Sequence, residues 1–172
     1  MIEILPNWHP ILVHFTLALF TVAALLFWAG AFLRQRAWAA NLTTTAFWNL
    51  WIGAGLTVAT VAAGFYAFNT VEHDAASHAA MTDHRNWALA TAGVWWGLAL
   101  WSGRIGRKGE RPPALFHLAL VPALLLLLAT GWKGGELVYR HGMGVMPPAA
   151  GIKAMPAEHS HGTNGKENGH TH

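Results

Sequence analysis

The sequence contains no cysteine and few charged residues. In a chain of 172 residues, the lack of cysteine excludes disulfides, thiolate metal sites, cysteine-ligated iron–sulfur clusters and covalent c-type haem attachment. Charged residues make up 11% of the chain, against roughly 25% in a soluble domain. Hydrophobic residues make up 53%, and 10 of the aromatic residues are tryptophan, which favours the bilayer interface. This composition predicts an integral membrane protein.

A nucleic-acid partner is not expected, because the basic residues lie in short segments between apolar runs rather than on one continuous face. The N-terminus lacks the positive segment of a signal peptide, and the first apolar run is too long for one. We therefore expect this run to be kept as a transmembrane helix.

Four apolar runs follow one another, at about 10–33, 47–68, 86–103 and 114–132, and a helical pattern continues from the last run toward His141. The first run is long enough to cross a hydrocarbon core of about 30 Å. We predict an all-α, integral membrane four-helix bundle over residues 1–145, surrounded by the lipid bilayer. Residues 37–46 and 69–85 are expected to be connections. Residues 146–172, rich in Pro, Gly, Ser, Asn and His, predict a disordered His-rich tail.

The basic residues indicate an orientation. The connections after the first and third runs carry six of the eleven Lys and Arg, while the N-terminal lead carries none. The positive-inside rule then places both termini outside a bacterial cytoplasmic (inner) membrane, although Lys133 and Arg140 run against it. Most histidines before the tail fall at this outer end: His9, His14, His73, His78, His84 and His141.

A histidine at the mouth of an apolar helix needs a partner or a function. His9 and His14 are about 140° apart on a helix, so they face different partners. The first and third helices of an up-and-down bundle lie on a diagonal, which is wider than the roughly 8–10 Å between neighbours. This geometry favours His14 with His84 as axial ligands of a b-type haem, and His73 with His141 as a second pair. In the alternative interpretation, these histidines only form hydrogen bonds between helices of a cofactor-free subunit.

A small metal ion is the other chemical interpretation. His73, Asp74, His78 and His84 lie within twelve residues, and imidazole suits copper or zinc. No pair has the spacing of a zincin motif, so a hydrolase is not supported. The tail histidines also suit metal binding, or are simply solvated.

The stretch from Gly134 to Gly142 is also dense in polar groups. Glu136 and Arg140 are spaced for an ion pair on a helix, and Glu136 with His141 would suit proton handling. The alternative is an interfacial anchor for the end of the last helix.

The chain resembles the small four-span bacterial membrane proteins grouped as domain of unknown function 2231. The resemblance rests on His9-Pro10 followed by Val13-His14-Phe15, on His84-Arg85, and on residues 134–142. It covers about residues 8–145. It implies that His9, His14, His84 and His141 are the family histidines, with His9 and His141 as another pair. Redox proteins beside or fused to such relatives imply electron transfer.

We therefore predict a membrane b-type haem-binding electron-transfer protein, with one or two haems near the outer (periplasmic) face. We expect an electron-transfer component rather than a stand-alone enzyme, with a periplasmic redox protein or membrane redox complex as partner. The predicted ligands are His14 with His84, then His9 with His141, while Glu136 and Arg140 support them or contact propionates. A metal-handling protein that uses His73, Asp74 and His78 is the alternative.

Overall fold

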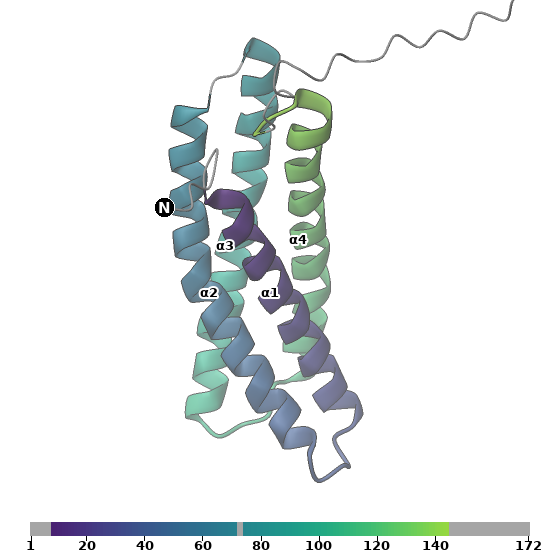
Figure 1. The fold of residues 1–172 in the computed structure, drawn as a ribbon. Helices are drawn as coiled ribbons and strands as arrows, with labels where there is room; N and C mark the ends of the chain where they lie inside the picture. Colours follow the sequence, from purple (N-terminus) through teal and green to yellow (C-terminus); the bar gives the residue numbers. More distant parts are fainter. Residues whose placement is uncertain (1–7, 72–73, 145–172) are drawn as a thin grey trace, which may run out of the picture.

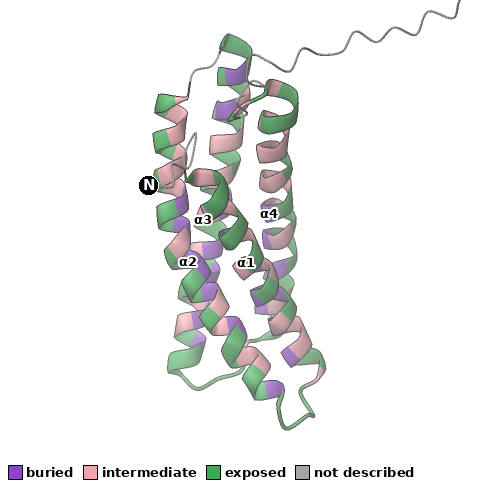
Figure 2. Ribbon diagram, in the orientation of Figure 1, coloured by how far each residue is buried: buried purple, intermediate pink, exposed green. Residues whose placement is uncertain are grey.

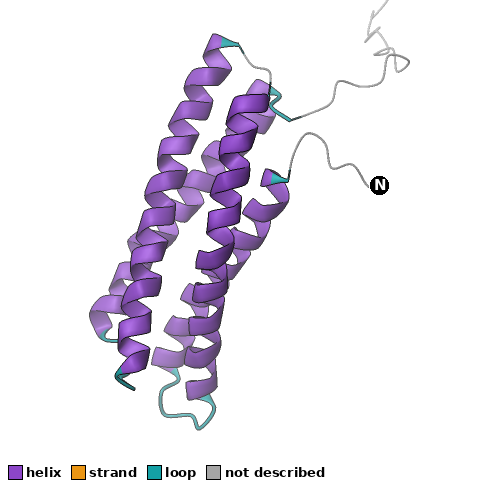
Figure 3. Ribbon diagram, turned by 90° about the vertical axis from the view of Figure 1, so that its left-hand side faces the viewer, coloured by secondary structure: helices purple, strands orange, loops and turns teal. Residues whose placement is uncertain are grey.

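The computed structural model describes residues 8–71 and 74–144, which form four helices joined by short connections (Figure 1). They are α1 (His9–Phe32), α2 (Ala39–Thr70), α3 (Ala75–Arg107) and α4 (Ala114–His141). The helices alternate in direction, so the start of α1 and the end of α4 lie toward the same end of the molecule. Helices and connections account for the whole described part of the chain, which confirms the predicted all-α bundle (Figure 3).

Each helix packs against two neighbours. α1 and α3 both pack against α2 and α4, so α1 lies diagonal to α3 across the bundle. Buried residues line the surfaces where the helices meet, and exposed residues cover the outside (Figure 2). The largest fully buried side chains are Phe20, Phe27, Leu50, Trp95, Ser102, Phe116 and Leu120.

Three helices, α1, α2 and α4, are long and apolar enough to cross a membrane. Helix α3 has 33 residues but falls short in hydropathy, since its central segment mixes leucine and alanine with tryptophan, glycine, threonine and serine. Its neighbours α2 and α4 flank it. The outside of the bundle is rich in exposed apolar side chains, as expected where lipid replaces water.

The predicted connections were too long. Residues 39–46 belong to α2, and α3 begins at Ala75 rather than at about residue 86. The reason is local: the Asp74 carboxylate accepts a hydrogen bond from the Ser77 backbone N–H at 2.8 Å and caps α3. The alanines that follow have the strongest helix propensity. His78 and His84 therefore lie on a helix and not in a loop.

The two hairpins, α1–α2 and α3–α4, repeat one pattern. Adding 75 to the number of a buried position in α1 gives a buried position in α3, and adding 70 to a buried position of α2 from Ala46 onward gives a buried or partly buried one in α4. The pairs in α1 and α3 are Thr16/Thr91, Phe20/Trp95, Ala23/Leu98, Ala24/Ala99, Phe27/Ser102 and Gly30/Ile105. In α2 and α4 they include Ala46/Phe116, Leu50/Leu120, Gly53/Ala123, Thr57/Leu127 and Thr60/Thr130. The bundle thus has an approximate internal two-fold symmetry.

The two-fold relation is visible in the centre of the core. The rings of Phe20 and Trp95, which are equivalent positions, stack across the diagonal with centroids 4.3 Å apart and an interplanar angle of 10°. At the end of the bundle that holds the start of α1, the symmetry is incomplete, because α1 begins well below the ends of the other three helices (Figures 1 and 3).

Candidate functional site

His9 is the first residue of α1, and its imidazole lies against α2. Its Nδ1 is 3.0 Å from the backbone carbonyl oxygen of Thr60. The ring also lies close over Gly64, where a Cβ atom would be 2.9 Å from Cε1 of the imidazole. Pro10 follows directly and suits a helix start, where its missing N–H is not needed. The His9 ring therefore lies at the start of α1, and its contacts with Thr60 and Gly64 on α2 fix its position.

His84 occupies the equivalent position in the second hairpin. Its ring lies against α4, where a Cβ at Gly134 would be 3.2 Å from Cε1. Nδ1 of His84 is buried without a hydrogen bond of standard geometry, and the Thr130 carbonyl is the backbone acceptor beside the ring.

The two histidines thus share one arrangement. Each stands seven residues before a threonine on its own helix, and each faces a threonine carbonyl and a glycine four residues later on the next helix. They come from diagonal helices and are close enough for their charges to interact. An imidazole whose Nδ1–H donates to a carbonyl keeps the Nε2 lone pair available for a metal. This pair is the strongest candidate for a ligand-binding site in the described part of the chain.

Below the histidines lies a layer of hydroxyl pairs. The hydroxyls of Thr16 and Thr60 are 2.9 Å apart between α1 and α2, and those of Thr91 and Thr130 are 2.7 Å apart between α3 and α4. Each pair ties together the two helices of one hairpin. Because the Thr60 and Thr130 carbonyls are the acceptors beside the histidines, these pairs also fix the position of those carbonyls.

Charged groups lie beside His84. Lys133 forms an ion pair with Asp83 and lies 5.3 Å from the centroid of the Trp87 ring. On the other side, the Arg85 guanidinium lies 4.8 Å from the centroid of the Phe68 ring on α2. These contacts fix α3 to both neighbours at the level of His84.

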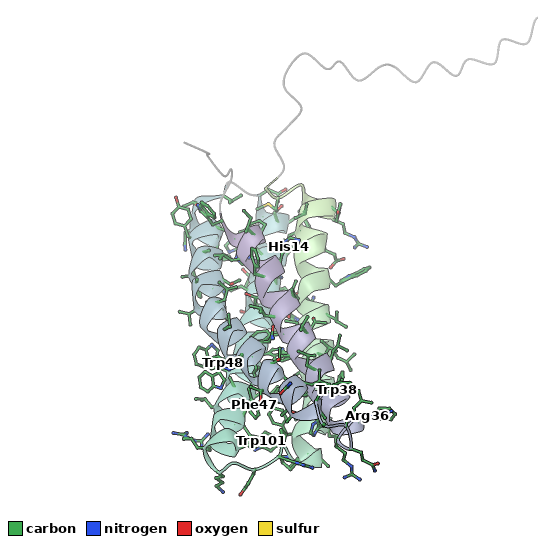
Figure 4. The ribbon with its side chains drawn as sticks, turned by 60° about the horizontal axis from the view of Figure 1, so that its bottom comes forward. His14, Arg36, Trp38, Phe47, Trp48 and Trp101 are labelled. Atoms are coloured by element: carbon green, nitrogen blue, oxygen red, sulfur yellow. The ribbon has the colours of Figure 1, made fainter. Side chains whose placement is uncertain are left out.

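His14 is placed differently from the prediction. Its side chain is exposed, and its Nδ1 is within hydrogen-bond distance of the Pro10 carbonyl on its own helix (Figure 4). His9 faces α2 instead, as the angle of about 140° between the two positions requires. The structure therefore brings His84 together with His9 and leaves His14 on the outside of α1.

His141, Glu136 and Arg140 lie in the last two turns of α4. Arg140 forms an ion pair with Glu136 at 3.1 Å, as their spacing predicted, and its side chain is exposed. His141 is partly buried and close enough to Asp74 for their charges to interact. It stands seven residues, or about 10 Å, beyond Gly134, so the structure places it farther out than the pair formed by His9 and His84.

The residues of the alternative metal site are not gathered in the described structure. His73 lies outside the described residues. The Ser77 backbone N–H donates to the Asp74 carboxylate and holds its pKa below the usual value, so this group serves as a helix cap. His78 is exposed, with its ring 5.4 Å from that of Phe68. Within residues 8–71 and 74–144, no group of three His, Cys, Asp or Glu side chains is placed to hold a metal ion.

Sequence reasoning missed the two threonine pairs and the glycines Gly64 and Gly134 as parts of the site. The signal was present as an internal repeat: His-x₆-Thr occurs at 9–16 and 84–91, and Thr-x₃-Gly at 60–64 and 130–134. The two halves of the repeat share few identical residues and differ in charge, so the repeat is hard to recognise in the sequence.

Comparison with known proteins agrees with the architecture. The family model described as "Predicted membrane protein (DUF2231)" matches residues 6–147. No curated protein and no solved structure matches the chain significantly. The match spans most of the chain, including all four helices, and the chain therefore belongs to the DUF2231 family of predicted membrane proteins.

Proposed function

We propose that this membrane protein binds a b-type haem between His9 and His84 and serves as a one-electron carrier at the outer face of the bacterial inner membrane. The observation that supports this most is the repeated setting of the two histidines. Each has a backbone carbonyl beside the ring and a glycine under it. Two imidazoles on helices that lie diagonal across a bundle would suit the iron of a b-type haem as ligands.

The surroundings fit this group. The diagonal of a four-helix bundle is about 11–14 Å if neighbouring axes are about 8–10 Å apart, which leaves room between α1 and α3 that neighbouring helices lack. The glycines let both rings approach the backbone of α2 and α4 instead of crowding the bundle axis.

The roles of the chain follow from these contacts. His9 and His84 would hold the iron, and the Thr60 and Thr130 carbonyls would fix the orientation of the two rings. A haem with two histidine ligands supplies reversible one-electron exchange and leaves no open position for substrate. Lys133 and Arg85 supply positive charge beside His84, where carboxylates of a haem would be stabilised. A periplasmic redox protein or a membrane redox complex is the expected partner.

The proposal is tested by optical spectra of the full chain purified in detergent from haem-replete cells. We expect a six-coordinate b-type spectrum that is lost or becomes five-coordinate in His9→Ala and in His84→Ala. His14→Ala is the matched control, because it removes an exposed histidine one turn away. Its spectrum should equal that of the wild type.

Two results would contradict the proposal. A colourless protein would exclude haem binding, and copper or zinc in the same sample would then favour metal handling. Loss of the spectrum in His14→Ala, with retention in His9→Ala, would show that the ligand assignment is wrong.

A further inference from the structure

The last turn of α3 presents two arginines at the end of the bundle that holds the α1–α2 and α3–α4 connections. Arg104 and Arg107 are exposed, and neither forms an ion pair within the described residues. This end of the molecule has one acidic side chain, Glu110, among its described residues. The cations there are Arg34, Arg36, Arg104, Arg107, Lys108 and Arg111.

Two tryptophans of α2 lie beside these arginines. The Trp51 ring packs on Gly103, the residue before Arg104, where a Cβ would be 2.9 Å from Cζ2 of the ring. Trp48 lies one turn farther toward the start of α2, and its side chain is 66% exposed. Because α2 and α3 run in opposite directions, Trp48 and Arg107 both lie nearer to this end of the bundle than Trp51 and Arg104 do. The seam between α2 and α3 thus joins exposed aromatic surface to unpaired positive charge.

The depth of this seam matches a lipid headgroup region. On α3, seventeen residues separate Trp87 from Arg104, which corresponds to about 26 Å of helix and nearly the thickness of a hydrocarbon core of about 30 Å. Trp87 is partly exposed near the other end. If Trp87 marks one interface, Arg104 and Arg107 lie at the opposite one.

We propose that Arg104 and Arg107 bind the phosphate of an anionic phospholipid, whose chains lie along Trp51 and Trp48 between α2 and α3. Guanidinium groups bind phosphate oxygens through two parallel hydrogen bonds, and tryptophan suits the boundary between headgroup and acyl chain. The preference for an anionic lipid follows from the surplus of positive charge, since a choline group would meet Lys108 and Arg111 as like charges. This site does not depend on the haem proposal.

Native mass spectrometry of the full chain tests the site, with phosphatidylglycerol and phosphatidylcholine as probes. We expect phosphatidylglycerol to bind more tightly, and binding to weaken about 10- to 30-fold in the double variant Arg104→Gln/Arg107→Gln. The matched control is Arg34→Gln/Arg36→Gln, which removes two charges from the same end of the molecule. It should retain nearly wild-type affinity.

Equal weakening in both double variants would overturn the proposal, because total charge and not a site would then explain the binding. Equal affinity for the two lipids in the wild type would overturn it as well. If the glutamine variant does not fold, as judged by size-exclusion and thermal unfolding, Arg104→Lys/Arg107→Lys replaces it. This variant keeps the charge but loses the paired hydrogen bonds, and we expect a loss of about threefold or more; unchanged affinity contradicts the site.

A competition experiment separates a lipid site from a simple anion site. Millimolar inorganic phosphate should leave bound phosphatidylglycerol in place, because it makes none of the chain contacts with Trp48 and Trp51. Displacement by inorganic phosphate would overturn the lipid assignment.

Discussion

Replacing Gly64 with alanine should damage the site without destabilising the bundle. A Cβ at this position would lie 2.9 Å from Cε1 and 3.1 Å from Nδ1 of His9. Carbon atoms in contact are about 3.5–4.0 Å apart, so the imidazole would have to retreat by about 0.6–1.1 Å. That movement also disturbs the distance of 3.0 Å between Nδ1 and the Thr60 carbonyl.

The expected effect on haem affinity is large. Binding constellations tolerate errors of about 0.5 Å, and loss of the groups that orient a ligand typically costs about 10–100-fold in metal affinity. We expect the affinity of Gly64→Ala for haem to fall within that range. Its helix should not weaken, since alanine in a helix interior is favoured over glycine by up to about 1 kcal/mol.

Haem titration of the apoprotein, followed by optical absorption, measures the affinity, and thermal unfolding of the apoprotein measures the fold. Gly55→Ala is the matched control, because Gly55 lies on the same helix and a Cβ there meets nothing within 4 Å. Wild-type affinity and spectrum in Gly64→Ala would refute the reasoning. Equal loss of affinity in Gly55→Ala would refute it too, since glycine content of α2 and not contact with His9 would then be responsible.

Three further predictions concern stability. Thr91→Val removes one hydroxyl pair between α3 and α4 and should destabilise the bundle by about 0.6–1.7 kcal/mol, measured by reversible unfolding in mixed detergent; an unchanged or raised stability would show that the pair contributes nothing. Trp95→Ala should lower the stability by about 3–5 kcal/mol in the same assay. Trp95→Phe should cost much less, because it keeps a ring in the stack with Phe20 and removes a buried N–H that has no hydrogen-bond partner within the described structure. Similar losses in the two variants would contradict this. Asp74→Ala should speed amide hydrogen exchange in the first turn of α3 at neutral pH, while Asp74→Asn keeps most of the cap. Because the folded pKa of Asp74 is below its usual value, the cap contributes fully above the unfolded pKa and is lost as the pH falls through the folded one, so the difference between wild type and Asp74→Ala should vanish in acid; a difference independent of pH would contradict the role of the carboxylate.

Much of the fold followed from composition and apolar run length. The four helices begin or end within a few residues of the predicted runs wherever the boundary is set by apolar residues, as at the start of α1 and at Ala114. The boundaries were wrong where polar residues continue a helix. Residues 75–85 carry Asp83, His84 and Arg85 and look like a loop, yet the Asp74 cap and a run of alanines make them helical.

The candidate site uses histidines that the sequence had named, but in another pairing. The family histidines included both His9 and His84, but the diagonal between the first and third helices was used to pair His84 with His14. Either His9 or His14 can face the bundle, and the buried face of α1 decides which one does. That face contains Thr16 and Phe20, which stand seven and eleven residues after His9. Counting from those positions selects His9, since neighbours on one helix face recur at such intervals.

The approximate two-fold symmetry has a consequence for how this protein can change over time. If two identical hairpins associated to make the same bundle, every inherited substitution would appear twice, once beside each histidine. In a single chain each change is made once, so one half can diverge while the other keeps its residues. The surroundings of the two histidines show this divergence. Asp83, Arg85 and Lys133 flank His84, and the positions that correspond to them are Trp8, Pro10 and Ala63. One hairpin is thus charged at positions where its counterpart is apolar, and a planar guest between them would meet two unlike sides and adopt one orientation.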